Sequence, residues 1–424
     1  MRPDPLQEYL SRSGVKGPWS VELASTGPFP GGIVIPALAE TDSIPLLLES
    51  LTADFSLPES GLIVLFVVNC REDATAEERA DNARTLTLLR GRAERLPFPV
   101  GIIDASATGL ALPARDGGVG LARKIGHDLL LPRLDCSAGD PVLISLDADS
   151  LVSAGYAGAV MKHFRSAAAG GAVIPFRHRP AAGERENRAI ERYELFLRCY
   201  VAGLAHADSP YAFQTVGSAM ACRASAYLKC GGMNRRRAGE DFYFLQSLAK
   251  SSGVSRVTGA TVYPSPRRSG RVPFGTGRAV GALLNREPDA VLFHRPESFL
   301  LLKGWLELAR AGCRQRFPDL AARAGEVSPL LQRFLEEQGF PSAWHGLLRH
   351  NGTEERLTSA FHRWFDAFRT MKFCHFLADG RYPRCEPGEV LDCFPEAWGE
   401  PGLTPSARLE MLRSRENDGC CASR

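Results

Sequence analysis

Apolar runs alternate with amphipathic stretches along the first two-thirds of the chain. Five short runs are apolar throughout, which predicts buried strands at residues 31–37, 61–69, 98–104, 141–147 and 170–176. Stretches with helical spacing separate them, at residues 43–53, 74–95, 117–131 and 154–167. Strands that do not alternate in polarity and are separated by helices are typical of a mainly parallel sheet covered on both faces. We therefore expect an α/β domain of the doubly wound type.

The pattern changes near residue 290. From there to residue 424, helical stretches follow one another with no strand pattern between them. One stretch carries an aromatic run from Trp364 to Phe376, which suits either a helical core or a face that docks an acceptor or a membrane surface. We expect three parts, namely a turn-rich lead-in at 1–30, an α/β domain at 31–289 and a helical C-terminal region at 290–424.

Composition narrows the class of protein. Apolar residues make up 44% and charged residues 23% of the 424 positions, as in ordinary globular proteins, and the net charge of +3 is too small for bulk nucleic-acid binding. The 11 cysteines include no CxxC pair, so we expect reduced thiols and no zinc knuckle. The N-terminus lacks the apolar core of a signal sequence, and the run at residues 61–68 is too short for a membrane span. We expect a cytoplasmic protein, with peripheral association at the inner membrane face as the alternative.

Two carboxylates follow the fourth predicted strand, where LDADS places Asp147 and Asp149 one residue apart. In a parallel α/β sheet, ligands bind beyond the carboxyl ends of the strands. If the strand stays extended, the two side chains point to the same side, about 6 to 7 Å apart. They would then hold one divalent cation whose remaining ligands include a phosphate oxygen. The alternative is a loop in which Asp149 begins a turn or caps the next helix.

Two glycine-rich segments also carry charged residues. GGMNRRRAGEDFYF, residues 231–244, ends in the pair Glu240–Asp241, which suits either a general base at a cleft or the acidic first turn of a helix. GGVGLARKIG, residues 117–126, lacks the spacing of a dinucleotide fingerprint. Its Arg123 suits either an approach to a diphosphate or a plain helix start.

Arginines without acidic neighbours follow Asp241. No Asp or Glu occurs between Phe242 and Arg286, whereas residues 264–278 carry four arginines, Arg267 and Arg271 among them. A solvated basic face is the alternative, but such faces usually mix signs. An acid-free arginine loop favours recognition of phosphate by bidentate donors.

Taken in order, these segments resemble the family 2 glycosyltransferases with the GT-A fold. IVIPALAE is similar to the first-strand motif VIPAYNE, with Leu38 and Ala39 in place of the aromatic residue and the Asn. GVGLARKIG is similar to GxxxARNxG, LDADS to the DxD motif, and GGMNRRRAGEDFYF to the GGF…GEDxxL motif. The resemblance covers residues 31–285. It implies inverting transfer of a sugar from a UDP, GDP or dTDP donor to a hydroxyl acceptor, with Mg²⁺ or Mn²⁺ as cofactor.

The resemblance also implies roles for individual residues. Asp241 would be the catalytic base that deprotonates the acceptor. Asp149 and Asp147 would bind the metal that bridges the diphosphate. The nucleotide-sugar-binding set would comprise Pro36, Ala37, Glu40, Asn69, Arg123, Asp147, Glu240, Arg267 and Arg271. The last two would fold over the donor as a lid.

Departures from the family pattern leave other functions open. Asn69 stands where the family often has paired Asp residues, so the sequence does not specify which nucleotide base the donor carries. The QxxRW motif of processive membrane synthases is missing. One alternative is a retaining GT-A enzyme with a small anionic acceptor such as a glycerate derivative. Another is a non-catalytic nucleotide-sugar-binding protein. A nucleotidyltransferase would need a basic glycine-rich loop after the first strand, which IPALAE lacks.

Overall fold

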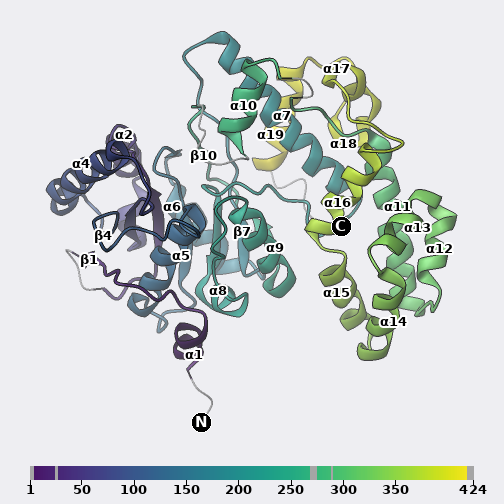
Figure 1. The fold of residues 1–424 in the computed structure, drawn as a ribbon, viewed down its shortest axis with the longest axis horizontal. Helices are drawn as coiled ribbons and strands as arrows, with labels where there is room; N and C mark the ends of the chain where they lie inside the picture. Colours follow the sequence, from purple (N-terminus) through teal and green to yellow (C-terminus); the bar gives the residue numbers. More distant parts are fainter. Residues whose placement is uncertain (1–3, 24–26, 268–274, 288–289, 418–424) are drawn as a thin grey trace. The chain divides into compact units, whose positions relative to one another are not determined.

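The computed structural model describes residues 4–23, 27–267, 275–287 and 290–417, with the helices and strands labelled in Figure 1. The chain forms two compact units. Unit 1 is built mainly from Met1–Asn187 and Thr215–Gly281, and unit 2 mainly from Arg188–Gln214 and Ala282–Arg415. Unit 2 thus takes a segment from inside the range 31–289, which the sequence pattern does not separate from the α/β domain.

Unit 1 is an α/β structure with an eight-stranded sheet in the order β1-β4-β3-β2-β5-β8-β7-β9. Its neighbours β4, β3, β2 and β5 are parallel, β8 is antiparallel to both β5 and β7, and β1 is antiparallel at one edge. The strands are β1 Glu22–Leu23, β2 Gly31–Ala37, β3 Ile63–Asn69, β4 Val100–Ala105, β5 Val142–Ser145, β7 Gly171–Val173, β8 Met220–Arg223 and β9 Val254–Arg256. The mainly parallel sheet confirms the predicted fold class.

Helices cover both faces of the sheet because its central strands are apolar throughout. All seven residues of β2 and of β3 are buried. In Figure 1, α2 (Ser43–Ala53) and α4 (Ala76–Arg92) lie beyond one face of the sheet and α5 (Val119–Leu130) beyond the other. Gly126 lets α5 approach closely, since a Cβ there would lie 2.3 Å from Cγ1 of Val34.

The order of the strands places a topological switch between β2 and β5. From β2 the chain runs outward to β3 and β4, and α5 then leads back to β5 on the other side of β2. In open α/β sheets, ligands bind at the carboxyl ends of the strands on either side of such a switch. The remaining elements of unit 1 are α1 Pro5–Arg12, α3 Ser56–Ser60, β6 Leu151–Val152, α6 Tyr156–Ser166, α8 Ala224–Lys229, α9 Glu240–Ser252, β10 Val262–Tyr263 and the start of α10 Thr276–Leu284.

The N-terminal lead-in is tied into unit 1 by a buried polar network. The Tyr9 hydroxyl, on α1, donates to Oδ1 of Asp128 at 2.8 Å and accepts from Nζ of Lys124 at 2.7 Å. The backbone N–H of Val15 donates to the other carboxylate oxygen of Asp128 at 2.7 Å. The lead-in therefore packs against α5, the helix that carries Arg123.

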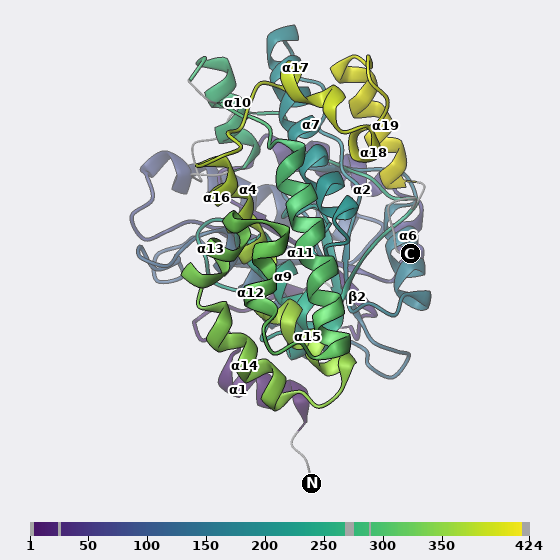
Figure 2. The same cartoon turned by 90° about the vertical axis from the view of Figure 1, so that its right-hand side faces the viewer.

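Unit 2 is helical, as predicted for the C-terminal region. Its helix α11 (Pro296–Gln315) contacts α12, α15 and α16 and runs among them in Figure 2. Phe365 and Phe373 of the aromatic run lie in the core, with Trp364 and Phe376 packed against it. Its other helices are α7 Glu184–His206, α12 Leu320–Val327, α13 Pro329–Glu337, α14 Phe340–His350, α15 Glu354–Trp364, α16 Ala367–Ala378, α17 Pro387–Val390, α18 Pro395–Trp398 and α19 Pro405–Asn417. Among the described residues, no helix is both long and apolar enough to cross a membrane.

Candidate active site

The ends of β2 and β3 bring the first predicted site residues together. Pro36 and Ala37 are the last residues of β2, and Asn69 is the last of β3. Nδ2 of Asn69 donates to the backbone oxygen of Ala37 at 3.2 Å and to that of Val67 at 3.0 Å. These hydrogen bonds tie the two strand ends at the edge where a ligand is expected.

The loop after β2 is held in place by α4. Ala39 has a left-handed backbone (φ 50°), and its N–H donates to Oδ1 of Asn82 at 2.9 Å. Thr41 is fixed in the same way, because its N–H donates to Oδ1 of Asp81 at 3.0 Å. Between these two anchors lies Glu40, which is buried.

The two acids of the LDADS segment lie in a turn. Strand β5 ends at Ser145, and the N–H of Ser150 donates to the backbone oxygen of Asp147 at 3.0 Å, which closes a four-residue turn. Of the two alternatives that the sequence leaves open, the structure has the loop, and Asp147 begins its turn. The turn gives the acids different partners, since Asp147 pairs with Arg123 and Asp149 pairs with Arg267.

Arg123 joins the LDADS segment to the segment that contains Glu240 and Asp241. Its side chain is only 2% exposed and forms ion pairs with both Asp147 and Glu240. Burial by itself lowers the pKa of Arg123, but these carboxylates raise it above its ordinary value, so the guanidinium stays charged. Gly217 leaves room for it, because a Cβ there would lie 2.5 Å from Nη2 of Arg123.

Arg267 joins the end of β2 to the other acid of the LDADS segment. The antiparallel pairing of Leu151 with Tyr263 in β6 and β10 brings the residues before β6 and after β10 to the same end. There Arg267 forms an ion pair with Glu40, and its Nε lies 2.9 Å from Oδ2 of Asp149.

The charge on Arg267 is stabilised by three acids. Burial lowers the pKa of Arg267, whereas Glu40, Asp149 and Asp147 raise it, with a net shift upward. Both acids of the LDADS segment therefore lie within electrostatic reach of one guanidinium. Arg271, the second predicted lid residue, lies outside the described residues.

Asp241 differs from the other acids of the site. It is the second residue of α9 and is partly buried, and its Oδ1 accepts the N–H of Phe242 at 2.7 Å. Among the residues that the structure describes, no arginine or lysine forms an ion pair with it. Burial and the charge of Glu240 raise the pKa of Asp241 to about 7, against the opposing effect of Arg123. A partly exposed carboxylate of this kind can accept a proton near neutral pH.

The described residues hold no ready-made metal cluster. No group of three His, Cys, Asp or Glu side chains within the described ranges is arranged to hold an ion. The two carboxylates of Asp147 and Asp149, within reach of one cationic group, fit an Mg²⁺ or Mn²⁺ ion that takes its other ligands from phosphate and water.

Three residues at the site were not found from the sequence. Gly217 makes room for Arg123, Asn82 holds the loop after β2, and Nη2 of Arg179 donates to the backbone oxygen of Asp149 at 3.0 Å. Asn82 had a usable signal, because a polar residue on the inward face of a predicted helix needs a partner. Gly217 and Arg179 belong to no motif, and only the fold brings them to the site.

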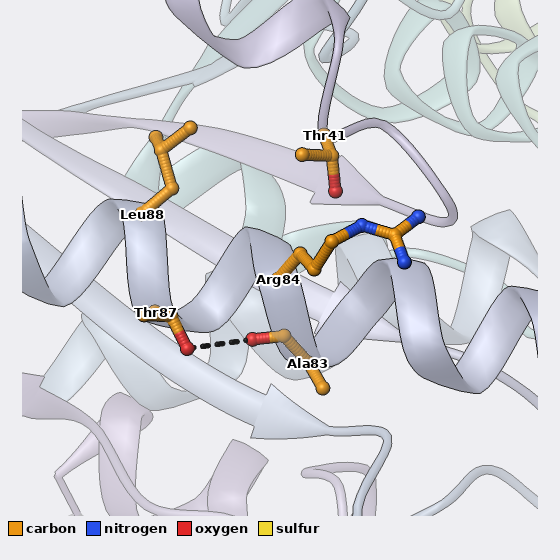
Figure 3. Close-up of a pocket in the computed structure, with 5 residues that line it drawn as sticks. All are labelled: Thr41, Ala83, Arg84, Thr87 and Leu88. Atoms are coloured by element: carbon orange, nitrogen blue, oxygen red, sulfur yellow. Dashed lines mark hydrogen bonds between the residues drawn. The ribbon is translucent and has the colours of Figure 1, made fainter.

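A surface pocket lies next to this site but lacks its chemistry. Figure 3 shows its lining, which consists of Thr41 and one stretch of α4, namely Ala83, Arg84, Thr87 and Leu88. The hydroxyl of Thr87 donates to the backbone oxygen of Ala83 at 3.0 Å. None of these lining residues is an acid, and none belongs to the predicted site.

No protein-family model matches the chain, and no curated protein is similar to it in sequence. Solved structures are similar over most of their length, among them the following two. S. aureus TarS 1-349 in complex with UDP-GlcNAc is 13% identical, with 80% of this chain and 91% of that chain covered and a TM-score of 0.39. Mannosyltransferase PcManGT from Pyrobaculum calidifontis in complex with GDP-Man and Mn²⁺ is 16% identical, with 86% and 95% covered and a TM-score of 0.35.

Proposed function

We propose that the protein is a glycosyltransferase that moves a sugar from a nucleotide-diphosphate sugar to a hydroxyl acceptor, with inversion and with Asp241 as the general base. The observation that carries this proposal is the distribution of charge at the switch point. Arg123 pairs with Asp147 and Glu240, and Arg267 pairs with Glu40 and Asp149. Asp241 remains outside these pairs, with its pKa raised to about 7.

The donor would bind at the carboxyl ends of β2, β3 and β5. Pro36, Ala37 and Asn69 would line the nucleoside, and Glu40 and Glu240 would complete the binding set through the arginines that they hold. The guanidinium of Arg267 lies next to Asp149, one of the acids that would face the diphosphate. An arginine binds phosphate oxygens through two parallel N–H donors. Arg271, the other arginine of the predicted lid, would also contact the donor.

Asp241 would take the proton of the acceptor hydroxyl. As the proton moves to the carboxylate, the acceptor oxygen forms a bond to the anomeric carbon, and the bond from that carbon to the diphosphate oxygen breaks. The nucleotide diphosphate leaves from the opposite face, so the anomeric centre inverts. A base with a pKa near the working pH suits this step.

A divalent cation would be held by Asp149 and Asp147. When bound, Mg²⁺ or Mn²⁺ would offset the negative charge on the leaving diphosphate. The ion pair between Asp149 and Arg267 must then loosen, which frees Arg267 for the phosphates.

Donor binding and one substitution test the proposal. Calorimetry with UDP-, GDP- and dTDP-sugars, with and without Mn²⁺, should find one donor that binds more tightly with the metal. Asp241→Asn should abolish transfer and leave the donor Kd unchanged. Retained turnover in Asp241→Asn would remove the base assignment, and no binding of any donor would remove the function. NMR of the product distinguishes inversion from the retaining alternative.

A further inference from the structure

Three consecutive arginines stand directly before the proposed base. Arg235, Arg236 and Arg237 lie in the loop between α8 and α9, and all three are exposed. Within the described part of the chain, none of them forms an ion pair with an acid. The segment just before α5 carries Arg115 as well as Asp116, so it adds no net negative charge beside this loop.

The loop that carries these arginines is firmly held. Nδ2 of Asn234 donates to the backbone oxygen of Glu240 at 2.7 Å, and its Oδ1 accepts the N–H of Arg236 at 3.1 Å. The guanidinium carbon of Arg236 lies 3.7 Å from the ring centre of Tyr243. A solvated basic loop needs no such anchors, whereas a binding loop gains from them because less freedom is lost when the ligand binds.

Glycines in α5 and just before it also make room for the loop. A Cβ at Gly120 would lie 2.4 Å from the backbone oxygen of Arg236 and 3.0 Å from that of Asn234. A Cβ at Gly118 would lie 3.0 Å from Cα of Arg237. The loop and the helix that carries Arg123 are therefore fitted to each other.

The ion pairs of the site form a series of alternating acids and arginines. Arg267 joins Glu40 to Asp149, and Arg123 joins the neighbouring Asp147 to Glu240. Asp241 follows Glu240 in α9, and the charges of Glu240, Arg123 and Asp147 act on its carboxyl group. If Arg267 contacts the donor diphosphate and Asp241 contacts the acceptor hydroxyl, the loop at 235–237 belongs to the acceptor side.

We propose that Arg235, Arg236 and Arg237 bind an anionic acceptor, one that carries a phosphate or carboxylate close to the hydroxyl group that receives the sugar. The inference rests on the proposed function and adds the chemical class of the acceptor. Arginine forks bind both anions through paired N–H donors. Stacking on Tyr243 fixes the plane of the Arg236 guanidinium and leaves its edge for such a contact.

Acceptors that differ only in charge test this inference. With the full chain and the donor found by calorimetry, we expect kcat/KM for glycerol 3-phosphate or glycerate to exceed that for glycerol by about tenfold or more. The relative values for the two anions distinguish phosphate from carboxylate. The double variant Arg235→Ala/Arg237→Ala should raise KM for the charged acceptors by about tenfold and leave the donor Kd unchanged. Arg165→Ala, an exposed arginine on α6, is the matched control and should leave these values unchanged.

Each outcome has a definite meaning. A kcat/KM for glycerol equal to that for the charged acceptors, or an unchanged KM in the double variant, overturns the inference. The proposed function still stands in that case if a donor binds. Failure to bind any donor overturns both. If none of these acceptors is glycosylated, inorganic phosphate supplies the measurement. Its Kd for the donor-loaded protein should rise about tenfold in the double variant, and an unchanged Kd overturns the inference.

Discussion

Asp241 owes its properties to its immediate neighbours along the chain and in space. Glu240 is buried in an ion pair with Arg123. The charges of Glu240 and Arg123 both act on Asp241, in opposite directions, but Asp241 forms no ion pair with this arginine. A carboxyl group that is partly buried beside a second carboxylate holds its proton to a higher pH. The same pair of residues thus supplies a structural anchor and a titrating group.

The activity should follow the titration of Asp241. Only the carboxylate form can accept the acceptor proton, and burial raises its pKa to about 7. We expect kcat/KM to rise about tenfold per pH unit below that value and to level off above it. The donor Kd, measured across the same range, is the control. A flat profile between pH 5 and 8, with chemistry shown to be rate-limiting, would contradict the assignment.

Ionisation of Asp241 should raise the activity but lower the free energy of unfolding of the chain. Because the folded pKa is raised above that of an unfolded Asp, ionisation of Asp241 costs stability as the pH rises toward 7. Asp241→Asn removes this cost, so we expect it to be more stable than the native chain by roughly 1 to 3 kcal/mol at pH 8 and nearly equal at pH 4. Urea unfolding at both pH values measures the difference. An equal effect at pH 4 and pH 8 would show that titration is not its cause.

At the scale of elements, short connections assemble the acids that we propose as metal ligands. The turn after β5 and the pairing of β6 with β10 bring Asp149 to Arg267, and the loop after β2 brings Glu40 to the same guanidinium. Under the proposed function, Arg267 would therefore compete with a cation for Asp149. The ion pair would have to open when the metal binds.

Removal of this competitor should strengthen binding of the bare metal. We expect Arg267→Gln to lower the Kd for Mn²⁺ alone several-fold, because one carboxylate is freed from its ion pair, and to weaken binding of the donor with metal present. Calorimetry measures both constants, with Arg165→Ala as control. A higher Kd for Mn²⁺ in Arg267→Gln would mean that the arginine positions Asp149 and does not compete for it.

The sequence predicted elements whose pattern is local. The central strands were found because each lies in an apolar run, whereas β8 (Met220–Arg223) ends in a charged arginine and has neither a purely apolar nor an alternating pattern. The sequence could not decide between an extended strand and a turn after β5, because the turn depends on a single backbone hydrogen bond to Asp147. The left-handed backbone of Ala39 could not be predicted from the alanine itself, since this conformation is typical of Gly and Asn. The motif VIPAYNE has Asn at this position.

The candidate site divides in the same way. Asp147, Asp149, Glu240 and Asp241 could be named from sequence because acids beside a strand end or a glycine loop form a local signal. Their pairing could not, because Arg123 and Glu240 are 117 positions apart and only the sheet order brings them together. No pattern of residues encodes which acid is left without an arginine.

At the scale of the whole molecule, the two units are interleaved along the chain. Helix α7 lies between strands of unit 1 in sequence, yet its apolar residues Leu195, Cys199 and Leu204 belong to the core of unit 2. The indole N–H of Trp398 donates to the backbone oxygen of Cys199 at 2.8 Å. The sequence boundary at 290 therefore separates α7 from the helices that bury it.

A chain truncated after residue 289 should expose this face of α7. Leu195 and Leu204 would lose Phe299, Leu302 and their other partners in the core, and each buried leucine side chain contributes about 1.5 to 3 kcal/mol. We expect the truncated chain to bind a hydrophobic dye and to self-associate in size-exclusion chromatography. Leu195→Gln and Leu204→Gln in the truncated chain should restore a monomer, because they make the exposed face polar while unit 1 keeps its own sheet. A monomeric truncated chain without dye binding would instead mean that α7 is covered by residues before 290.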